Sequence, residues 1–219
     1  WNGDNAKAYR DTLEYTQAQG IPWRGHPIFW PGENYMPSYI KAAAGNPAKQ
    51  REQVLDHVRD VMRYIKPYAP FAVDMVNEVR VNRYFQENGN PDLVAESFKL
   101  AHELAPEIPL FVNDYAILNS GGLNAGAIEY YHDWIADMRG QGVPLGGIGF
   151  QSHFSAGLTP PQRVRDILAG FAKYDLPLHI TEFDIETLDE AAQADYTRDF
   201  LLAIFAEPKV EAFIMWGFY

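Results

Sequence analysis

The stretch that decides the fold is "FAVDMVNEVR", residues 71–80, which begins apolar and ends polar. A short, mostly apolar run without alternation is typical of a strand that is buried on both faces. Asn77 and Glu78 stand where the hydrophobicity stops, so an amide and a carboxylate are placed at the mouth of a buried strand. A carboxylate in that position is expected to have a partner elsewhere in the chain.

Five further stretches have the same apolar centre, and helical patterns separate them. Val54, Val58 and Ile65 recur at helical spacing before residues 71–77, and similar stripes precede the later strands. Thr159, followed by two prolines, predicts the N-cap of one of these helices. Buried strands that alternate with helices predict an α/β fold with a parallel sheet. The six predicted strands cover residues 23–30, 71–77, 109–114, 146–152, 177–184 and 211–217.

Two α/β architectures fit this order, a doubly wound sheet and a barrel. A doubly wound nucleotide-binding sheet should carry a glycine-rich phosphate turn, and neither GxGxxG nor GxxxxGK[ST] occurs. Polar or aromatic residues instead follow every predicted strand, and in a (β/α)8 TIM barrel those strand ends converge on one face. We therefore expect a (β/α)8 barrel that is incomplete in this chain, with six strand–helix units in a single domain over residues 1–219. The residues in question are His26, Trp30, Asn77, Glu78, Asn113, Asp114, Tyr115, Gln151, His153, Glu182, Asp184 and Trp216.

Composition narrows the classes of partner. The chain has 219 residues and a formal net charge of −11, with 18 basic residues that do not cluster. Nucleic acids and anionic membranes are disfavoured, because both require a basic patch. No apolar run is long enough to span a bilayer, and cysteine is absent.

The most plausible partner of Glu78 is Glu182, in "HITEFDI". Two carboxylates at the ends of different barrel strands can face each other about 5–5.5 Å apart, with one attacking carbon and the other transferring the proton. Such a pair hydrolyses glycosidic bonds. In a strand, residues two apart point the same way, so His153 is expected beside Glu182 with Asp184 orienting its imidazole.

Each of these residues, taken alone, could also have a purely structural role. A single Glu at a strand end often caps the next helix, and a lone His or Trp more often belongs to the core or rim. By strict alternation Asn77 should point away from Glu78, unless the strand ends in a bulge or turn. No HExxH or clustered His spacing supports a metal site, and we expect no cofactor.

Six motifs, in order, carry a resemblance that covers essentially the whole chain: "RGHPIFW" (24–30), "VNE" (76–78), "NDY" (113–115), "GIGFQSH" (147–153), "ITEFDI" (180–185) and "WG" (216–217). Together they resemble glycoside hydrolase family 10, whose members are retaining endo-β-1,4-xylanases on a (β/α)8 barrel. The resemblance implies Glu78 as acid/base and Glu182 as nucleophile, a polysaccharide substrate such as xylan, and a secreted or extracellular location. The substrate-binding residues that it implies are His26, Trp30, Asn77, Tyr115, Gln151, His153 and Trp216.

The sequence also departs from the family pattern. Pro31 follows Trp30 where a His is usual, Ala116 follows "NDY" where Asn is commoner, and the region around Trp30 is closer to a divergent plant-like branch. The family's first two strands and last helix have no counterpart here, and the chain opens on Trp1. We therefore expect the missing strands to come from the rest of a longer chain. A related barrel glycosidase acting on β-glucan or mannan, or a non-catalytic carbohydrate-binding pseudo-enzyme, remains the alternative function.

Overall fold

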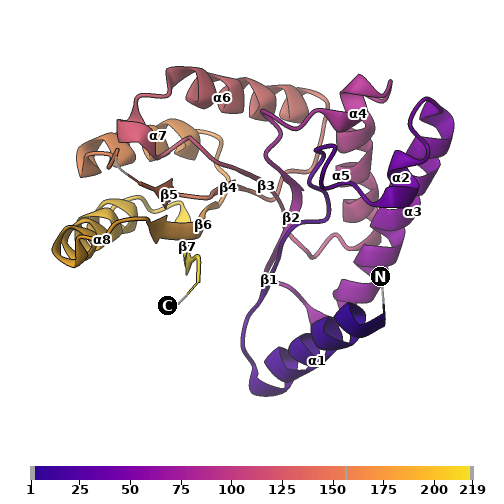
Figure 1. Ribbon diagram of the computed structural model, residues 1–219, viewed down its shortest axis with the longest axis horizontal. Coiled ribbons are helices and arrows are strands. Elements are labelled where there is room, and N and C mark those ends of the chain that lie inside the picture. The colour runs from indigo at the N-terminus through magenta and orange to yellow at the C-terminus, as the bar shows by residue number, and fades with distance from the viewer. Residues whose placement is uncertain (1–2, 156, 218–219) are drawn as a thin grey trace.

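The computed structural model describes residues 3–155 and 157–217, and Trp1, whose identity prompted the expectation of a longer chain, lies outside them. A single curved parallel sheet forms the centre, and the helices cover its outer side (Figure 1). The helices are α1 (Gly3–Gln19), α2 (Ser38–Lys41), α3 (Pro47–Ile65), α4 (Tyr84–Glu87), α5 (Leu93–Leu104), α6 (Ala125–Gly140), α7 (Pro161–Ala172) and α8 (Glu190–Phe205), with 3₁₀ turns η1 (Lys66–Tyr68) and η2 (Ser120–Gly122).

All of the paired strands run parallel. They are β1 (Arg24–Gly25), β2 (Ala72–Asn77), β3 (Leu110–Asp114), β4 (Gly147–Phe150), β5 (His153–Phe154), β6 (Leu178–Ile185) and β7 (Val210–Met215). The order across the sheet is β1-β2-β3-β4-β6, and both β5 and β7 pair with β6. Among the described residues, β1 pairs only with β2 and β7 only with β6, so the sheet is open between these two edges.

Each of the six predicted strands has a counterpart where the sequence places it, and two of them differ in detail. The first predicted strand is reduced to β1 and an isolated bridge between Phe29 and Val76. The fourth, predicted over 146–152, breaks after Phe150 because Ser152 adopts a left-handed backbone with φ of 68°. The chain then resumes as β5, which pairs with β6 through His153 and Asp184.

The helical stripes predicted from periodicity face the sheet. In α3 the buried side chains include Val54, Val58 and Ile65, and Asn46 caps the helix by accepting the Lys49 N–H at 3.1 Å. The predicted cap at Thr159 is wrong: Pro160 occupies the N-cap of α7, because the Thr159 hydroxyl instead donates to the Leu118 carbonyl at 2.5 Å. Thr159 thereby ties the loop after β3 to the start of α7.

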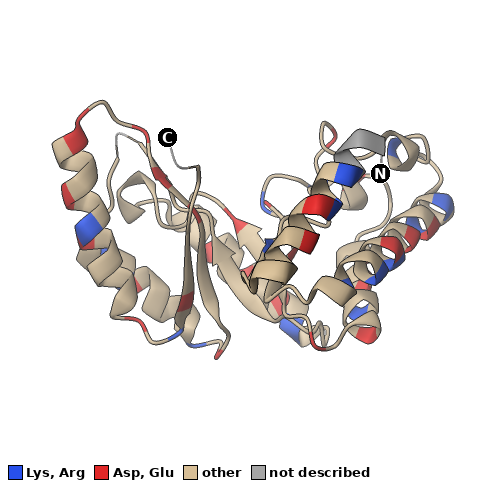
Figure 2. Cartoon of the chain, turned by 90° about the horizontal axis from the view of Figure 1, so that it is seen from below, with Lys and Arg blue, Asp and Glu red and all other residues tan. Residues whose placement is uncertain are grey.

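One continuous hydrophobic core joins the helices to the sheet, with side chains from α3, α5, α6, α7 and α8 packed on the strands. Acidic and basic side chains are interspersed along the outer helices, and some charged residues also lie on the strands (Figure 2). Among the described residues, no helix is both long and apolar enough to cross a membrane. Because every strand runs the same way, all of the carboxyl ends lie at one edge of the sheet, where the predicted polar residues are gathered.

Candidate active site

A cavity of about 360 Å³ opens at the carboxyl ends of the strands. It brings together side chains that follow five different strands, and both predicted carboxylates, Glu78 and Glu182, line it. Asp184 does not line this cavity, but its carboxylate contacts His153, which does. The lining residues are His26, Trp30, Tyr35, Asn77, Glu78, Tyr115, Asn119, Gln151, His153, Glu182 and Trp216.

Glu78 reaches the cavity because the backbone turns sharply at the end of β2. Asn77 is the last residue of the strand, and Glu78 has a left-handed φ of 58°. That conformation breaks the strand's alternation, so that Asn77 and Glu78 both line the cavity although they are neighbours in sequence. A left-handed backbone is costly for a residue with a side chain, and such conformations gather at functional sites.

The Glu78 carboxylate accepts three hydrogen bonds from neutral side chains. The Trp30 indole N–H donates to Oε2 at 3.1 Å, and the Asn82 amide donates to the same oxygen at 3.2 Å. The Gln151 amide donates to Oε1 at 3.1 Å. Both oxygens of this carboxylate are therefore held in fixed positions.

Glu182 is more deeply buried, at 6% exposure, and it is held by different groups. Its Oε1 accepts a hydrogen bond from the Asn113 amide at 2.7 Å, and its Oε2 lies 3.2 Å from His153 Nε2. The Nδ1 of the same imidazole lies 2.9 Å from Asp184 Oδ1. The hydrogen bond to Glu182, and after it the one to Asp184, raises the pKa of His153, while burial opposes the rise.

A chain of side-chain amides connects the two carboxylates. Thr181 donates its hydroxyl proton to Asn113 Oδ1 at 2.7 Å, so the Asn113 NH₂ group points towards Asn77 Oδ1 and Glu182. Gln151 donates both to Asn77 Oδ1 at 3.2 Å and to Glu78. Glu78 and Glu182 are thus fixed relative to each other by hydrogen bonds that join residues of β2, β3 and β6 with Gln151, which follows β4.

His26 lies on the opposite side of Glu182 from His153. Its Nδ1 is 2.9 Å from the carboxylate of Asp74, which is fully buried and also forms an ion pair with Arg24. The other ring nitrogen, Nε2, lies 3.9 Å from Glu182 Oε1. The hydrogen bond to Asp74 directs the imidazole towards Glu182.

Aromatic rings form the walls of the cavity. The rings of Trp30 and Tyr35 are stacked with centroids 3.8 Å apart and planes at 13°. Trp216 is 56% exposed and meets His153 edge-on at 5.6 Å, and the Arg80 guanidinium lies 5.0 Å over the ring of Tyr115. Flat apolar faces beside hydrogen-bonding groups suit a sugar, whose ring has C–H faces and hydroxyl edges.

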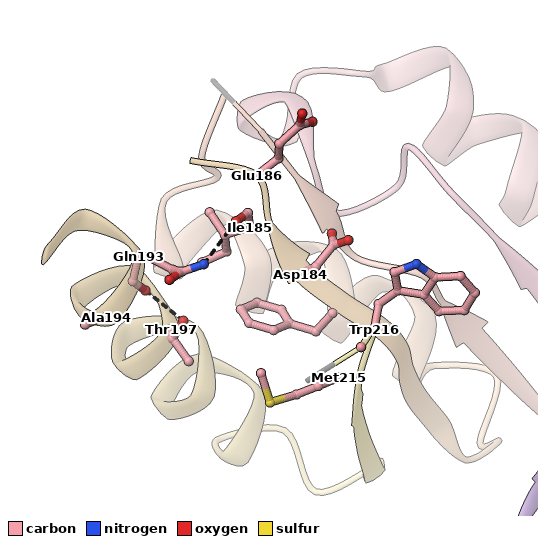
Figure 3. Close-up of a pocket in the computed structure, with 10 residues that line it drawn as sticks. Asp184, Ile185, Glu186, Gln193, Ala194, Thr197, Met215 and Trp216 are labelled. Carbon is pink, nitrogen blue, oxygen red and sulfur yellow. Dashed lines mark hydrogen bonds between the residues drawn. The ribbon is translucent and has the colours of Figure 1, made fainter. Parts of the chain in front are cut away.

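A second and larger hollow, of about 800 Å³, lies on the other side of Trp216 between the end of β6, β7 and α8 (Figure 3). Met215 and Trp216 extend along it from the end of β7, and Glu186 stands at its upper rim. Asp184 lines this hollow and also contacts His153, which lines the smaller cavity. Asp184 therefore lies between the two cavities. Glu78 and Glu182 are not among the residues that line it, and we place the candidate chemistry in the smaller cavity.

Three residues of the site were not among the candidates from the sequence: Tyr35, Asn82 and Asn119. Asn119 donates to the His153 carbonyl at 3.0 Å and lines the cavity. All three lie in loops beyond the strand ends, where periodicity gives no signal. Among the described residues, no three His, Asp or Glu side chains are grouped so as to hold a metal ion.

Comparisons with known proteins agree with this geometry. The family model described as Glycosyl hydrolase family 10 matches residues 5–219. Endo-1,4-beta-xylanase 2 of Arabidopsis thaliana is 31% identical over 215 residues, which cover 96% of this chain and 20% of that protein. This chain spans about a fifth of the length of this relative and of Endo-1,4-beta-xylanase 1 of the same plant.

Solved structures share the fold. Native xylanase 10B from Thermotoga maritima superimposes with a TM-score of 0.84 at 24% identity, covering 96% of this chain and 67% of that chain. Xylanase 10B from Thermotoga petrophila RKU-1, solved in complex with xylobiose, has a TM-score of 0.84 at 24% identity and covers 96% of this chain and 66% of that chain. The prediction of a (β/α)8 barrel that is incomplete in this chain is confirmed.

Proposed function

This chain belongs to glycosyl hydrolase family 10, and from that premise we propose that it carries the catalytic site of a retaining endo-β-1,4-xylanase. The observation that carries the proposal is the shared cavity of Glu78 and Glu182, in which each carboxylate has its own set of hydrogen-bond donors. Two carboxylates in unlike surroundings can take unlike roles in one reaction. Sugar binding is supported by the aromatic walls of the same cavity.

In the first step, a Glu182 oxygen attacks the anomeric carbon while Glu78 gives its proton to the glycosidic oxygen. The bond between that carbon and oxygen breaks, and a glycosyl ester forms on Glu182. Asn113 and His153 hold the Glu182 carboxylate for this attack. His26 faces the same carboxylate from the other side.

In the second step, Glu78, now a carboxylate, takes a proton from water as the water attacks the same carbon. The ester bond breaks, Glu182 is released as a carboxylate, and two inversions leave the sugar with its original anomeric configuration. Asn77 Oδ1, Gln151 and Tyr115 line the space that the sugar would occupy, and we assign them to substrate binding with Trp30 and Trp216.

The test is replacement of Glu182 by Gln in the natural protein, assayed on xylan. Removing the nucleophile should lower kcat by at least about 10³-fold with folding intact. Glu186→Gln is the matched control, because Glu186 lines the neighbouring hollow four residues along the chain and should leave the rate unchanged. A Glu182→Gln variant with undiminished activity would remove the assignment.

The stereochemistry and the substrate are tested separately. Proton NMR of the first product should show the β anomer, and an initial α anomer would rule out a retaining mechanism. Xylan, barley β-glucan and mannan should be compared at equal concentration, with xylan expected to be hydrolysed fastest. Binding of xylan without hydrolysis would indicate the non-catalytic carbohydrate-binding alternative.

A further inference from the structure

Asn82 lies in the segment that leaves the end of β2, and its side chain folds back onto Glu78. Its Nδ2 donates to the Glu78 carbonyl and to Glu78 Oε2, both at 3.2 Å, and its backbone N–H donates to the same carbonyl at 3.1 Å. One asparagine thus contacts both the backbone and the carboxylate of the proposed acid. Asn82 is not among the residues that line the cavity, so it contacts Glu78 from outside.

The loop that carries Trp30 holds Asn82 in place. A side chain at Gly32 would overlap Asn82 Oδ1 and come within 2.9 Å of the Tyr35 ring, so the absence of a Cβ lets the Asn82 amide pack against this loop. The Tyr84 N–H donates to the Pro31 carbonyl at 2.9 Å and joins the two loops beyond this contact. The donors from Trp30 and Asn82 therefore belong to one packed unit.

These donors divide unevenly between the two oxygens of Glu78. Among the described residues, Oε2 accepts from Trp30 and Asn82, whereas Oε1 accepts only from Gln151. A protonated carboxyl has one hydroxyl oxygen, and that oxygen must point its own proton at an acceptor. A hydroxyl at Oε2 would face two N–H groups, whereas a hydroxyl at Oε1 can accept from Gln151 and still direct its proton into the cavity.

We propose that Asn82 is a positioning residue for the general acid: with Trp30 it holds Glu78 Oε2 as the unprotonated oxygen and so places the transferable proton on Oε1. This inference rests on the proposed function. In the first step the proton moves from Oε1 to the glycosidic oxygen, and the negative charge that appears on Glu78 is met by the three N–H donors already in place. In the second step the same oxygen, Oε1, takes the proton from water.

The distinguishing measurement is the dependence of the rate on the leaving group. In a natural oligosaccharide the leaving group is a sugar alkoxide, which is a poor leaving group and needs the proton of Glu78. Dinitrophenolate is a good leaving group and departs without a proton. In Asn82→Ala, kcat/KM for xylo-oligosaccharides should fall about 10-fold or more, the effect of losing a hydrogen bond to a charged group. For 2,4-dinitrophenyl β-xylobioside it should change less than about twofold.

Asn88→Ala is the matched control, because the Asn88 amide donates to the Tyr84 carbonyl in the same segment at 2.8 Å. This change should leave kcat/KM unchanged for both substrates. Equal loss on both substrates in Asn82→Ala, or no loss on either, would overturn the inference. If Asn82→Ala does not fold, Gly32→Ala displaces the same amide and should give the same difference between substrates.

A spectroscopic measurement separates this inference from the proposed function. The side-chain ¹⁵N–¹H signals of Asn82 should move when Glu78 is replaced by Ala, because their acceptor is lost, and unmoved signals would contradict the contact. If the signals move but the unaltered protein does not hydrolyse xylan, the proposed function fails and the placement of Asn82 stands. If xylan is hydrolysed and Asn82→Ala changes kcat/KM equally for the two substrates, the inference fails and the function stands.

Discussion

Asp114 shows how burial at the end of a strand can outweigh favourable hydrogen bonds. It is 1% exposed and accepts the backbone N–H of Tyr115 at 2.8 Å and that of Arg80 at 3.2 Å. Burial is the largest influence and raises the pKa of Asp114 to about 7, the charge of Glu78 adds to the rise, and the backbone donors and Arg80 oppose it. The end of β3, next to the cavity residue Tyr115, therefore contains a carboxyl group that changes charge near neutral pH.

The pKa of Asp114 predicts a slope of stability with pH. The raised pKa of Asp114 means that between about pH 4 and pH 7 the folded protein keeps a proton that the unfolded chain has released. The free energy of unfolding should therefore fall as the pH rises through this window. The free energy of unfolding, measured by urea denaturation at several pH values, should fall less steeply with pH in Asp114→Asn than in the unaltered protein. The difference in slope should be up to about 1.4 kcal/mol per pH unit. Equal slopes in the two proteins would show that Asp114 does not titrate there.

At the residue scale, the sequence could place the candidate carboxylates but not their surroundings. Glu78 and Glu182 follow from the ends of apolar strands, and the structure puts both in one cavity, while their catalytic roles stay predictions. The direction of Asn77 could not be predicted, because it depends on the left-handed φ of Glu78. Asn82 gave no signal, because its contact with Glu78 depends on how two loops pack.

At the scale of elements, the turn between α3 and β2 contains a strained residue. Ala69 closes η1 with φ of 47° and ψ of 61°, and its N–H donates to the Lys66 carbonyl at 3.2 Å. Its side chain is exposed and contributes little packing. A left-handed backbone suits glycine better than alanine, because the Cβ crowds the neighbouring backbone.

Ala69→Gly should therefore stabilise the protein by about 0.5–1 kcal/mol, the strain relieved exceeding the extra entropy of the unfolded chain. Ala136→Gly is the control, because Ala136 is exposed in the middle of α6 and the change should cost about 0.5–1 kcal/mol there. Thermal unfolding of the two variants should move in opposite directions. A loss of stability in both would show that the turn is not strained.

The elements themselves were predictable where periodicity was strong. Apolar centres and helical stripes identified the strands and the helices that cover them, since both patterns report burial directly. The division between β4 and β5 was missed, because it depends on the left-handed backbone of a single residue, Ser152, for which the sequence gives no signal. The cap of α7 was missed because Thr159 found a tertiary partner in place of its local one.

At the scale of the whole molecule, the hydrophobic core is continuous while the sheet is open. Buried side chains connect α2 and α3 to α8 without a break, yet among the described residues β1 and β7 each have a single neighbour. We propose from these two edges that further strands lie against β1 and β7 in the natural protein. The continuous core favours a single cooperative unit, which stays a prediction.

That unit should unfold in one transition. Hydrogen exchange followed by mass spectrometry, with increasing urea, should release the amides of β2 and of β6 at the same denaturant midpoint, because the same core stabilises both. These two strands come from the two halves of the sequence, so they report on the halves separately. Midpoints that differ clearly would divide the chain into two units.

The hydroxyl of Thr181 has a consequence for which sequences can keep this site. Asparagine has a nearly symmetric side chain, and the proton that Thr181 donates to Asn113 Oδ1 helps to keep the NH₂ group of that amide towards Glu182 and Asn77. Valine has the same shape as threonine but no hydroxyl, so it would leave the buried Asn113 Oδ1 without this donor and would weaken the hold on the amide. Serine keeps the donor. Across natural variants, position 181 should therefore tolerate a change of size more readily than the loss of the hydroxyl group.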